Sequence, residues 1–161
     1  MRWRCFRQSA VVEAVTDIRL LETGFSPGRG LGKFAQQVPE AGGIASFVGK
    51  VRADDGVKAL ELSHYEPLTL PGMQQLAQQT IGRWQLDGLL MWHRVGIMRP
   101  NAPIVLVSAA ARHRRDAFEA ADFVMDHLKS DAWFWKRERR DDGWHWIDPR
   151  AADHDDLARW G

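Results

Sequence analysis

The chain has 161 residues, of which 45% are hydrophobic and 27% are charged, the balance of a globular domain that can bury its own core. The formal net charge is +1, which argues against both a protein that coats polyanions and a strongly acidic carrier. Any electrostatic specialisation must therefore be local, and one domain is expected.

Cysteine content and hydropathy indicate the compartment. Cys5 is the only cysteine, which excludes an intramolecular disulfide and a zinc site built from several thiolates. No apolar run approaches the ~20 residues needed to span a bilayer, and the opening segment 1–7 is not followed by the apolar stretch of a signal peptide. We expect a cytoplasmic protein without membrane contact.

The N-terminal third contains the only glycine-dense segment, residues 24–32. A phosphate-binding loop is one interpretation, but the segment lacks the Gly-Lys-Ser/Thr ending and the preceding buried strand of such loops. We expect a flexible connection here, preceded by an N-terminal arm over residues 1–12.

Alternating apolar residues predict strands at 44–51 and 57–66, with Asp54-Asp55-Gly56 as a hairpin turn between them. Thr69-Leu70-Pro71 then predicts the start of an amphipathic helix that ends near Arg83.

The second half repeats this pattern. Strands are predicted at 89–95 and 104–110, the second central in its sheet because it is almost continuously apolar. A helix follows at 115–129, with a core face at helical spacing formed by Phe118, Ala121, Met125 and Leu128. Asp141-Asp142-Gly143 joins two final strands, 133–140 and 144–147, in a hairpin.

The predicted order is ββαββαββ. Strand pairs separated by helices favour an α+β domain with largely antiparallel sheets over a doubly wound parallel one. This domain is expected to span residues 13–150, and residues 151–161 are expected to form a charged, solvated tail.

Basic residues gather near the ends of the predicted elements, where they could line one pocket for an anion. Taken singly, each is more simply a solvated surface charge. They are Lys50, Arg52, His113, Arg114, Lys129, Lys136, Arg137 and Arg150.

The motifs around these residues favour the pocket. In order, they resemble the molybdopterin synthase large-subunit (MoaE) family over residues 42–150. They are Phe47-Val48-Gly49-Lys50-Val51-Arg52, Leu62-Ser63-His64-Tyr65, His93-Arg94-Val95-Gly96, His113-Arg114 with Ala117-Phe118-Glu119-Ala120, Met125-Asp126-His127-Leu128-Lys129, and Phe134-Trp135-Lys136-Arg137-Glu138.

The resemblance implies an α/β hammerhead fold and a homodimer within a heterotetramer, flanked by two small ubiquitin-like subunits. Each small subunit would end in a Gly-Gly thiocarboxylate, whose sulfur passes to cyclic pyranopterin monophosphate to form the dithiolene of molybdopterin. The implied activity is that of a sulfurtransferase in molybdenum cofactor biosynthesis.

The resemblance also implies the site residues. Phe47 and Met125 would be apolar neighbours of the pterin, and Arg150 would come from the other subunit. The remaining substrate contacts would be Lys50, Val51, Arg52, His113, Arg114, Lys129, Lys136, Arg137 and Glu138.

The chemistry fits these residue types, because opening a cyclic phosphate requires fixed cations where negative charge develops. We expect Lys129 to be the principal catalytic group and Lys136 its partner, since two nearby cations depress one another's pKa. His113 is equally compatible with a structural role and with a role as acid or phosphate ligand, whereas His64 and His93 are expected to be structural.

No cofactor is expected. Asp153-His154-Asp155-Asp156 suggests a metal site, but the chain offers no second ligand cluster, and no bound metal is expected. Cys5 lies outside the resemblance and is expected to be a bystander thiol.

Two departures from the family pattern stand out. The turn Ala53-Asp54-Asp55-Gly56 is shorter than the polar loop common in the family, which affects how that rim meets substrate, and residues 66–70 add a short stretch.

Two other classes of function compete. A module that grips nucleic acid would use the basic residues and the eight tryptophans, but the near-neutral net charge and the lack of an RNA-binding signature argue against it. A phosphate-ester hydrolase would require clustered metal ligands, which the sequence lacks.

Overall fold

The structure is a computed structural model that describes residues 13–54, 56–130 and 133–161. The elements follow in the order β1 (Val15–Leu21), α1 (Pro27–Gln37), β2 (Gly43–Lys50), β3 (Ala59–His64), α2 (Glu66–Trp84), β4 (Gly88–Arg94), β5 (Gly96–Met98), β6 (Pro103–Ala111), α3 (Arg114–Ser130), β7 (Phe134–Arg140), β8 (Gly143–Ile147) and α4 (Ala151–Ala158).

The strands form two four-stranded sheets, ordered β1-β4-β6-β2 and β5-β3-β7-β8. Only β1 and β4 pair in parallel, while every other described pair is antiparallel. The predicted α+β class with largely antiparallel sheets is therefore confirmed. The prediction that the strand at 104–110 is central is also confirmed, because β6 lies between β4 and β2.

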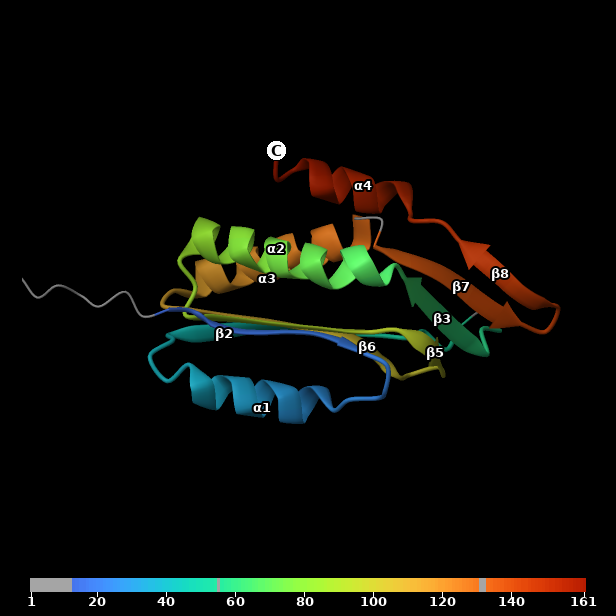
Figure 1. Cartoon of the computed structure of the whole chain (residues 1–161), viewed down its shortest axis with the longest axis horizontal. Coiled ribbons are helices and arrows are strands. Elements are labelled where there is room, and N and C mark those ends of the chain that lie inside the picture. Colours follow the sequence, from blue (N-terminus) through green and yellow to red (C-terminus); the bar gives the residue numbers. More distant parts are fainter. Residues whose placement is uncertain (1–12, 55, 131–132) are drawn as a thin grey trace, which may run out of the picture.

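Helices cover both faces of the first sheet (Figure 1). Helix α1 lies on one face, α2 and α3 lie on the other, and α4 lies outside α2 and α3. The second sheet projects from one end of this stack. The largest buried cluster fills the space between the first sheet and helices α2 and α3, and includes Leu89, Val107 and Val124.

The glycine-dense segment was wrongly predicted to be a flexible connection, because Pro27–Gln37 forms helix α1. Ser26 caps this helix by accepting a hydrogen bond from the backbone of Arg29 (3.4 Å), and Pro27 occupies its first turn. Gly30 is buried where α1 meets the sheet, and a Cβ there would lie 2.7 Å from the ring of Trp92. That glycine permits close packing of the helix on the sheet.

The hairpin predicted at Asp54-Asp55-Gly56 is also wrong. Strand β2 pairs with β6 in the first sheet, whereas β3 pairs with β5 and β7 in the second. Asp55 itself lies outside the described residues. The turn signal marks a change of direction, but it does not determine which strands pair.

The hairpin at Asp141-Asp142-Gly143 is confirmed by the pairing of β7 with β8. The ββαββαββ order holds only in outline, because the structure adds β1, α1, β5 and α4. Helix α2 begins at Glu66 and not at Thr69, so that Pro71 lies inside it.

Phe118 was wrongly assigned to the core face of α3, since 65% of its surface is exposed. The buried face of α3 instead includes Ala117, Ala121, Val124 and Leu128, which recur every three or four residues. Phe118 falls one position outside this stripe.

The C-terminal segment was expected to be a solvated tail, but Ala151–Ala158 forms helix α4, which contacts α3. The predicted N-terminal arm, residues 1–12, lies outside the described residues. Within the described ranges, no helix is both long enough and apolar enough to cross a bilayer.

Candidate active site

The segment Lys50-Val51-Arg52 is fixed at the junction of the two sheets. The backbone N–H of Val51 donates to the carbonyl of Ala102 (3.0 Å), and the Val51 carbonyl accepts from Asn101 (2.8 Å). The register of β2 against β6 shifts between Gly49 and Lys50, and such an irregularity re-aims the side chains that follow it.

The Val51 side chain anchors this segment to the second sheet. Only 3% of Val51 is exposed, and it belongs to a buried cluster with Leu60, Leu62 and Met98. Val51 is therefore a packing residue, and its burial anchors the chain between Lys50 and Arg52 to the second sheet.

Strand β7 presents Lys136 and Glu138 on this same face. Lys136 lies opposite Leu62 and Glu138 lies opposite Leu60 in the pairing of β7 with β3. Because side chains alternate along a strand, both charged groups share the face of the two buried leucines.

Arg137 lies on the other face of the sheet. It forms an ion pair with Glu61, its cross-strand neighbour, and its guanidinium lies 4.6 Å from the centre of the Trp144 ring. The structure thus separates Arg137 from Lys136, although the resemblance implies that both contact substrate.

Lys136 is the electrostatic centre of the cluster. Burial is the largest cause that lowers its pKa from the ordinary value, and the carboxylate of Glu138 opposes this by raising the pKa. Arg52 and Arg150 lower the pKa further, and Asp153 raises it. Charges at the end of β2, on β7 and at the start of α4 therefore act on the pKa of one lysine amine.

The pairing of Lys129 with Lys136 stays a prediction. The cations whose charges lower the pKa of Lys136 are Arg52 and Arg150. Lys129 lies exposed in the last turn of α3. The next residue, Ser130, donates a hydrogen bond to the carbonyl of Asp153 (2.6 Å), so the end of α3 meets the first turn of α4.

The two apolar residues of the expected pterin pocket differ in exposure. Phe47 is 42% exposed on β2, and Gly49 leaves room for its ring, which would lie 3.3 Å from a Cβ at that position. Met125 is 8% exposed and belongs to the main core. Phe47 is accessible to a ligand, whereas Met125 mainly supports α3.

His113 and Arg114 lie at the other end of the domain. Arg114 begins α3 and Lys129 lies in its last turn, which places their backbones about 22 Å apart at the helical rise of about 1.5 Å per residue. One chain therefore does not bring all the expected basic residues into a single pocket.

His93 has the structural role expected for it. It is 7% exposed, its ring stacks on that of Phe134 (centroids 3.9 Å apart), and its Nδ1 lies 3.0 Å from the carbonyl oxygen of Arg94. Burial lowers the pKa of His93 to about 4, so the ring is neutral near pH 7.

Sequence analysis missed Asp153 as a member of this cluster because residues 151–161 were interpreted as a solvated tail. One local signal was present: an acidic residue at the third helical position after Arg150 is typical of a helix start. In the structure, Asp153 Oδ2 accepts a hydrogen bond from the backbone of Arg150 (3.1 Å).

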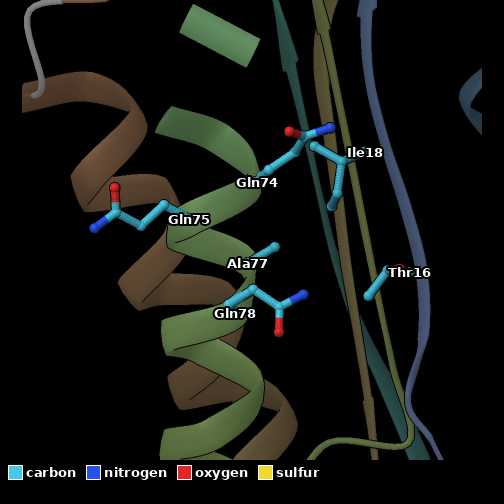
Figure 2. Close-up of a pocket in the computed structure, with 6 residues that line it drawn as sticks. All are labelled: Thr16, Ile18, Gln74, Gln75, Ala77 and Gln78. Carbon is cyan, nitrogen blue, oxygen red and sulfur yellow. The ribbon is translucent and has the colours of Figure 1, made fainter. Parts of the chain in front are cut away.

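A separate groove of about 520 Å³ runs between β1 and α2. Gln74 and Gln78 extend from the helix toward Ile18 and Thr16 on the strand, whereas Gln75 points away (Figure 2). No titratable side chain lines this groove, which is therefore distinct from the Lys136 cluster.

Metal ligands do not gather within the described residues, where no group of three or more His, Cys, Asp or Glu side chains is arranged to hold an ion.

These observations define a class of protein: an α+β domain of two mostly antiparallel sheets with a cationic cluster at their junction. The family model described as MoaE protein matches residues 22–131, and the chain belongs to this family. A protein from Ralstonia nicotianae called molybdopterin synthase catalytic subunit is 42% identical over 147 residues, which cover 89% of this chain and 84% of that protein. A protein of the same name from Caulobacter vibrioides is 42% identical over 144 residues, covering 89% and 96% of the two chains.

Solved structures agree. The molybdopterin biosynthesis MoaE protein from Burkholderia ambifaria is 38% identical and superposes with a TM-score of 0.77, covering 92% of this chain and 99% of that one. A protein-protein complex of subunits 1 and 2 of molybdopterin-converting factor from Helicobacter pylori contains a chain with a TM-score of 0.72. That chain is 19% identical, covers 85% and 92% of the two chains, and shows the fold alone.

Proposed function

We propose that this chain is the catalytic subunit of a molybdopterin synthase that works in the cytoplasm. It takes sulfur from the thiocarboxylated C-terminus of a small ubiquitin-like partner and passes it to cyclic pyranopterin monophosphate. The observation that carries the proposal is the convergence of Arg52, Arg150 and Glu138 on the half-buried Lys136, in a chain 42% identical to proteins of that name.

The cluster suits a phosphorylated substrate. Arg52 and Arg150 are permanent cations that bind phosphate oxygens bidentately and stabilise the negative charge that develops as the cyclic phosphate opens. The lowered pKa of Lys136 brings its neutral amine closer to physiological pH, so this group is suited to moving a proton during sulfur addition. Lys129, at the end of α3, supplies a further mobile cation.

The sulfur comes from outside the chain. Cys5 is the only cysteine, so the sequence holds no cysteine pair that could deliver two sulfur atoms. A Gly-Gly tail on the partner would reach a narrow site because glycine lacks a side chain. The fold shared with a chain of the Helicobacter pylori protein-protein complex supports a protein partner for this chain as well.

The active protein is a homodimer within a heterotetramer, and a second copy supplies His113 and Arg114. The support is their position at the far end of α3 from Lys129, where they do not meet the Lys136 cluster of their own chain. Arg150, which the family resemblance assigns to the other subunit, already acts on Lys136 of its own chain. This contribution supports the proposal that His113 and Arg114 are the residues that reach the site of the other copy.

The test is reconstitution. Purified protein is incubated with the cyclic pterin precursor, with and without a thiocarboxylated Gly-Gly partner, and dithiolene formation is measured. Product is expected only with the partner and is expected to be unchanged in Cys5→Ser. Turnover without the partner, or loss of transfer in Cys5→Ser, would contradict the proposed sulfur route.

A further inference from the structure

Asp126 of α3 is a nearly buried carboxylate that binds the C-terminus of the chain. Only 9% of its side chain is exposed. Its Oδ2 atom accepts hydrogen bonds from Arg159 Nε (3.0 Å), Arg159 Nη2 (2.6 Å) and Trp160 Nε1 (2.7 Å). Charge-assisted hydrogen bonds of this kind are short and directional, and they fix residues 159 and 160 on α3.

Aromatic packing reinforces this attachment. The Trp160 ring meets the rings of Trp84 and Phe123 edge to face, with centroids 5.8 Å and 5.4 Å away. The guanidinium of Arg83 lies over both Trp84 and Trp160, and it donates to the carbonyl of Trp160 (3.4 Å). The chain end is therefore held by α2 as well as by α3.

Helix α4 depends on these attachments. It has eight residues, none of which is buried, and a helix this short is marginal without tertiary support. Its C-terminal end is held through Arg159 and Trp160, and its first turn is held by the hydrogen bond from Ser130 to the carbonyl of Asp153. The same first turn follows Arg150, whose charge reaches Lys136.

We infer that Asp126, Arg159 and Trp160 form a clamp that positions Arg150 and Asp153 beside Lys136. They are positioning residues: Asp126 lies on α3, Arg159 and Trp160 follow the end of α4, and together they hold the helix whose first turn carries Arg150 and Asp153. The clamp deepens the proposed function and rests on it for the activity measurement, whereas its structural consequences can be measured without any substrate.

The experiment compares Asp126→Asn and Trp160→Ala with wild type. Hydrogen exchange of residues 150–158 reports whether α4 is released, and exchange there is expected to accelerate on the order of 10-fold. The pH dependence of Lys136 acylation by an amine-reactive reagent, followed by peptide mass spectrometry, reports the surroundings of its amine. Release of α4 would move Arg150 away and expose Lys136, and both changes raise the pKa of Lys136. Loss of Asp153 lowers that pKa by a smaller amount, so acylation is expected to shift to higher pH.

In the reconstituted reaction, KM for the cyclic pterin precursor is expected to rise on the order of 10-fold, since misplaced binding groups weaken productive binding. Trp160→Phe, which keeps the ring contacts, should recover part of the loss. Asp116→Asn, in the first turn of α3, is the matched control and should behave as wild type. Thermal unfolding verifies that each variant is folded.

Two results would overturn the clamp: unchanged exchange over residues 150–158 in Asp126→Asn, or accelerated exchange with an unaltered Lys136 profile and unaltered KM. If wild-type protein makes no product with its partner, the proposed function fails. Exchange and acylation would still decide the clamp, because neither measurement involves the reaction.

Discussion

Lys136 differs from an ordinary surface lysine because of where β7 places it. It shares a sheet face with buried leucines, and two arginines and two carboxylates from other positions act on its amine. Burial and the arginines lower its pKa, while Glu138 and Asp153 raise it. Single substitutions should therefore shift its pKa in either direction: removing an arginine raises the pKa, and removing a carboxylate lowers it.

Arg52→Gln and Glu138→Gln should move the pH profile of sulfur transfer in opposite directions. If transfer uses the neutral amine of Lys136, activity rises as pH passes through its pKa. Arg52→Gln removes a cation that lowers this pKa, so the rise moves to higher pH, and Glu138→Gln removes an anion that raises it, so the rise moves to lower pH. The measurement is kcat/KM against pH, and parallel shifts in both variants would refute this role of Lys136.

His93 should make the protein sensitive to acid. Its pKa is lowered from 6.5 to about 4 in the fold, so the unfolded chain binds a proton that the folded chain does not as pH falls through this window. The free energy of unfolding should drop by about 2 kcal/mol between pH 7 and pH 4.5 from this group alone. His93→Phe keeps a ring against Phe134 and should lack this part of the drop in urea unfolding. An identical pH dependence in both proteins would count against it.

At the scale of elements, helix α1 shows how glycine can mislead. Gly30 is buried against Trp92 and Leu106, where a Cβ would approach to 2.7 Å and 2.9 Å, whereas Gly32 has nothing within 4 Å. Glycine density alone suggested a loop, although Ser26 and Pro27 carry the signal of a helix start. The reason for Gly30 lies in strands more than sixty residues away, beyond the range of a local pattern.

Gly30→Ala and Gly32→Ala therefore form a matched pair on one helix. Gly30→Ala should destabilise the fold by about 1–3 kcal/mol through overpacking. Gly32→Ala should stabilise it by up to about 1 kcal/mol, because alanine is the better helix former. Urea unfolding measures both, and similar effects of the two substitutions would contradict the packing of α1 on the sheet.

Other elements show the same division between local and distant causes. Apart from the short β5, periodicity predicted the strands and helices between residues 44 and 147, and turn residues predicted the Asp141-Asp142-Gly143 hairpin, since these depend on neighbouring residues. The pairing of β2 with β6 depends on contacts about sixty residues apart, and α4 depends on Asp126 of another helix. The pairing of β2 with β6 leaves no local pattern, and the acidic residue that marks the start of α4 does not show where that helix packs.

At the scale of the whole molecule, the expected site residues divide into two groups. Arg52, Lys136 and Arg150 gather at the junction of the sheets near the end of α3, while His113 and Arg114 lie at its start. Motif resemblance identified both groups, but only the fold shows the distance between them. That distance is the reason for expecting a site shared between two copies.

Mixing inactive variants tests this sharing. Lys129→Ala mixed with His113→Ala should restore about a quarter of wild-type activity, because half of randomly assembled dimers would hold one intact site. Lys129→Ala mixed with Lys136→Ala should restore none, since both residues belong to the same group. Restoration by Lys129→Ala mixed with Arg150→Ala would place Arg150 across the interface. A strictly monomeric protein would contradict the shared site.

The most direct test of the cluster as the catalytic site is single-turnover sulfur transfer by lysine variants, with thiocarboxylated partner in excess. Lys58 is the matched control, because it precedes β3 of the same sheet and pairs with Asp141 in an exposed position. Lys129→Ala and Lys136→Ala should each slow transfer about 100-fold or more while thermal unfolding stays close to that of wild type, and Lys58→Ala should react as wild type does. If the Lys129→Ala and Lys136→Ala variants are both folded and each transfers sulfur at a near-normal rate, the assignment of the site is contradicted.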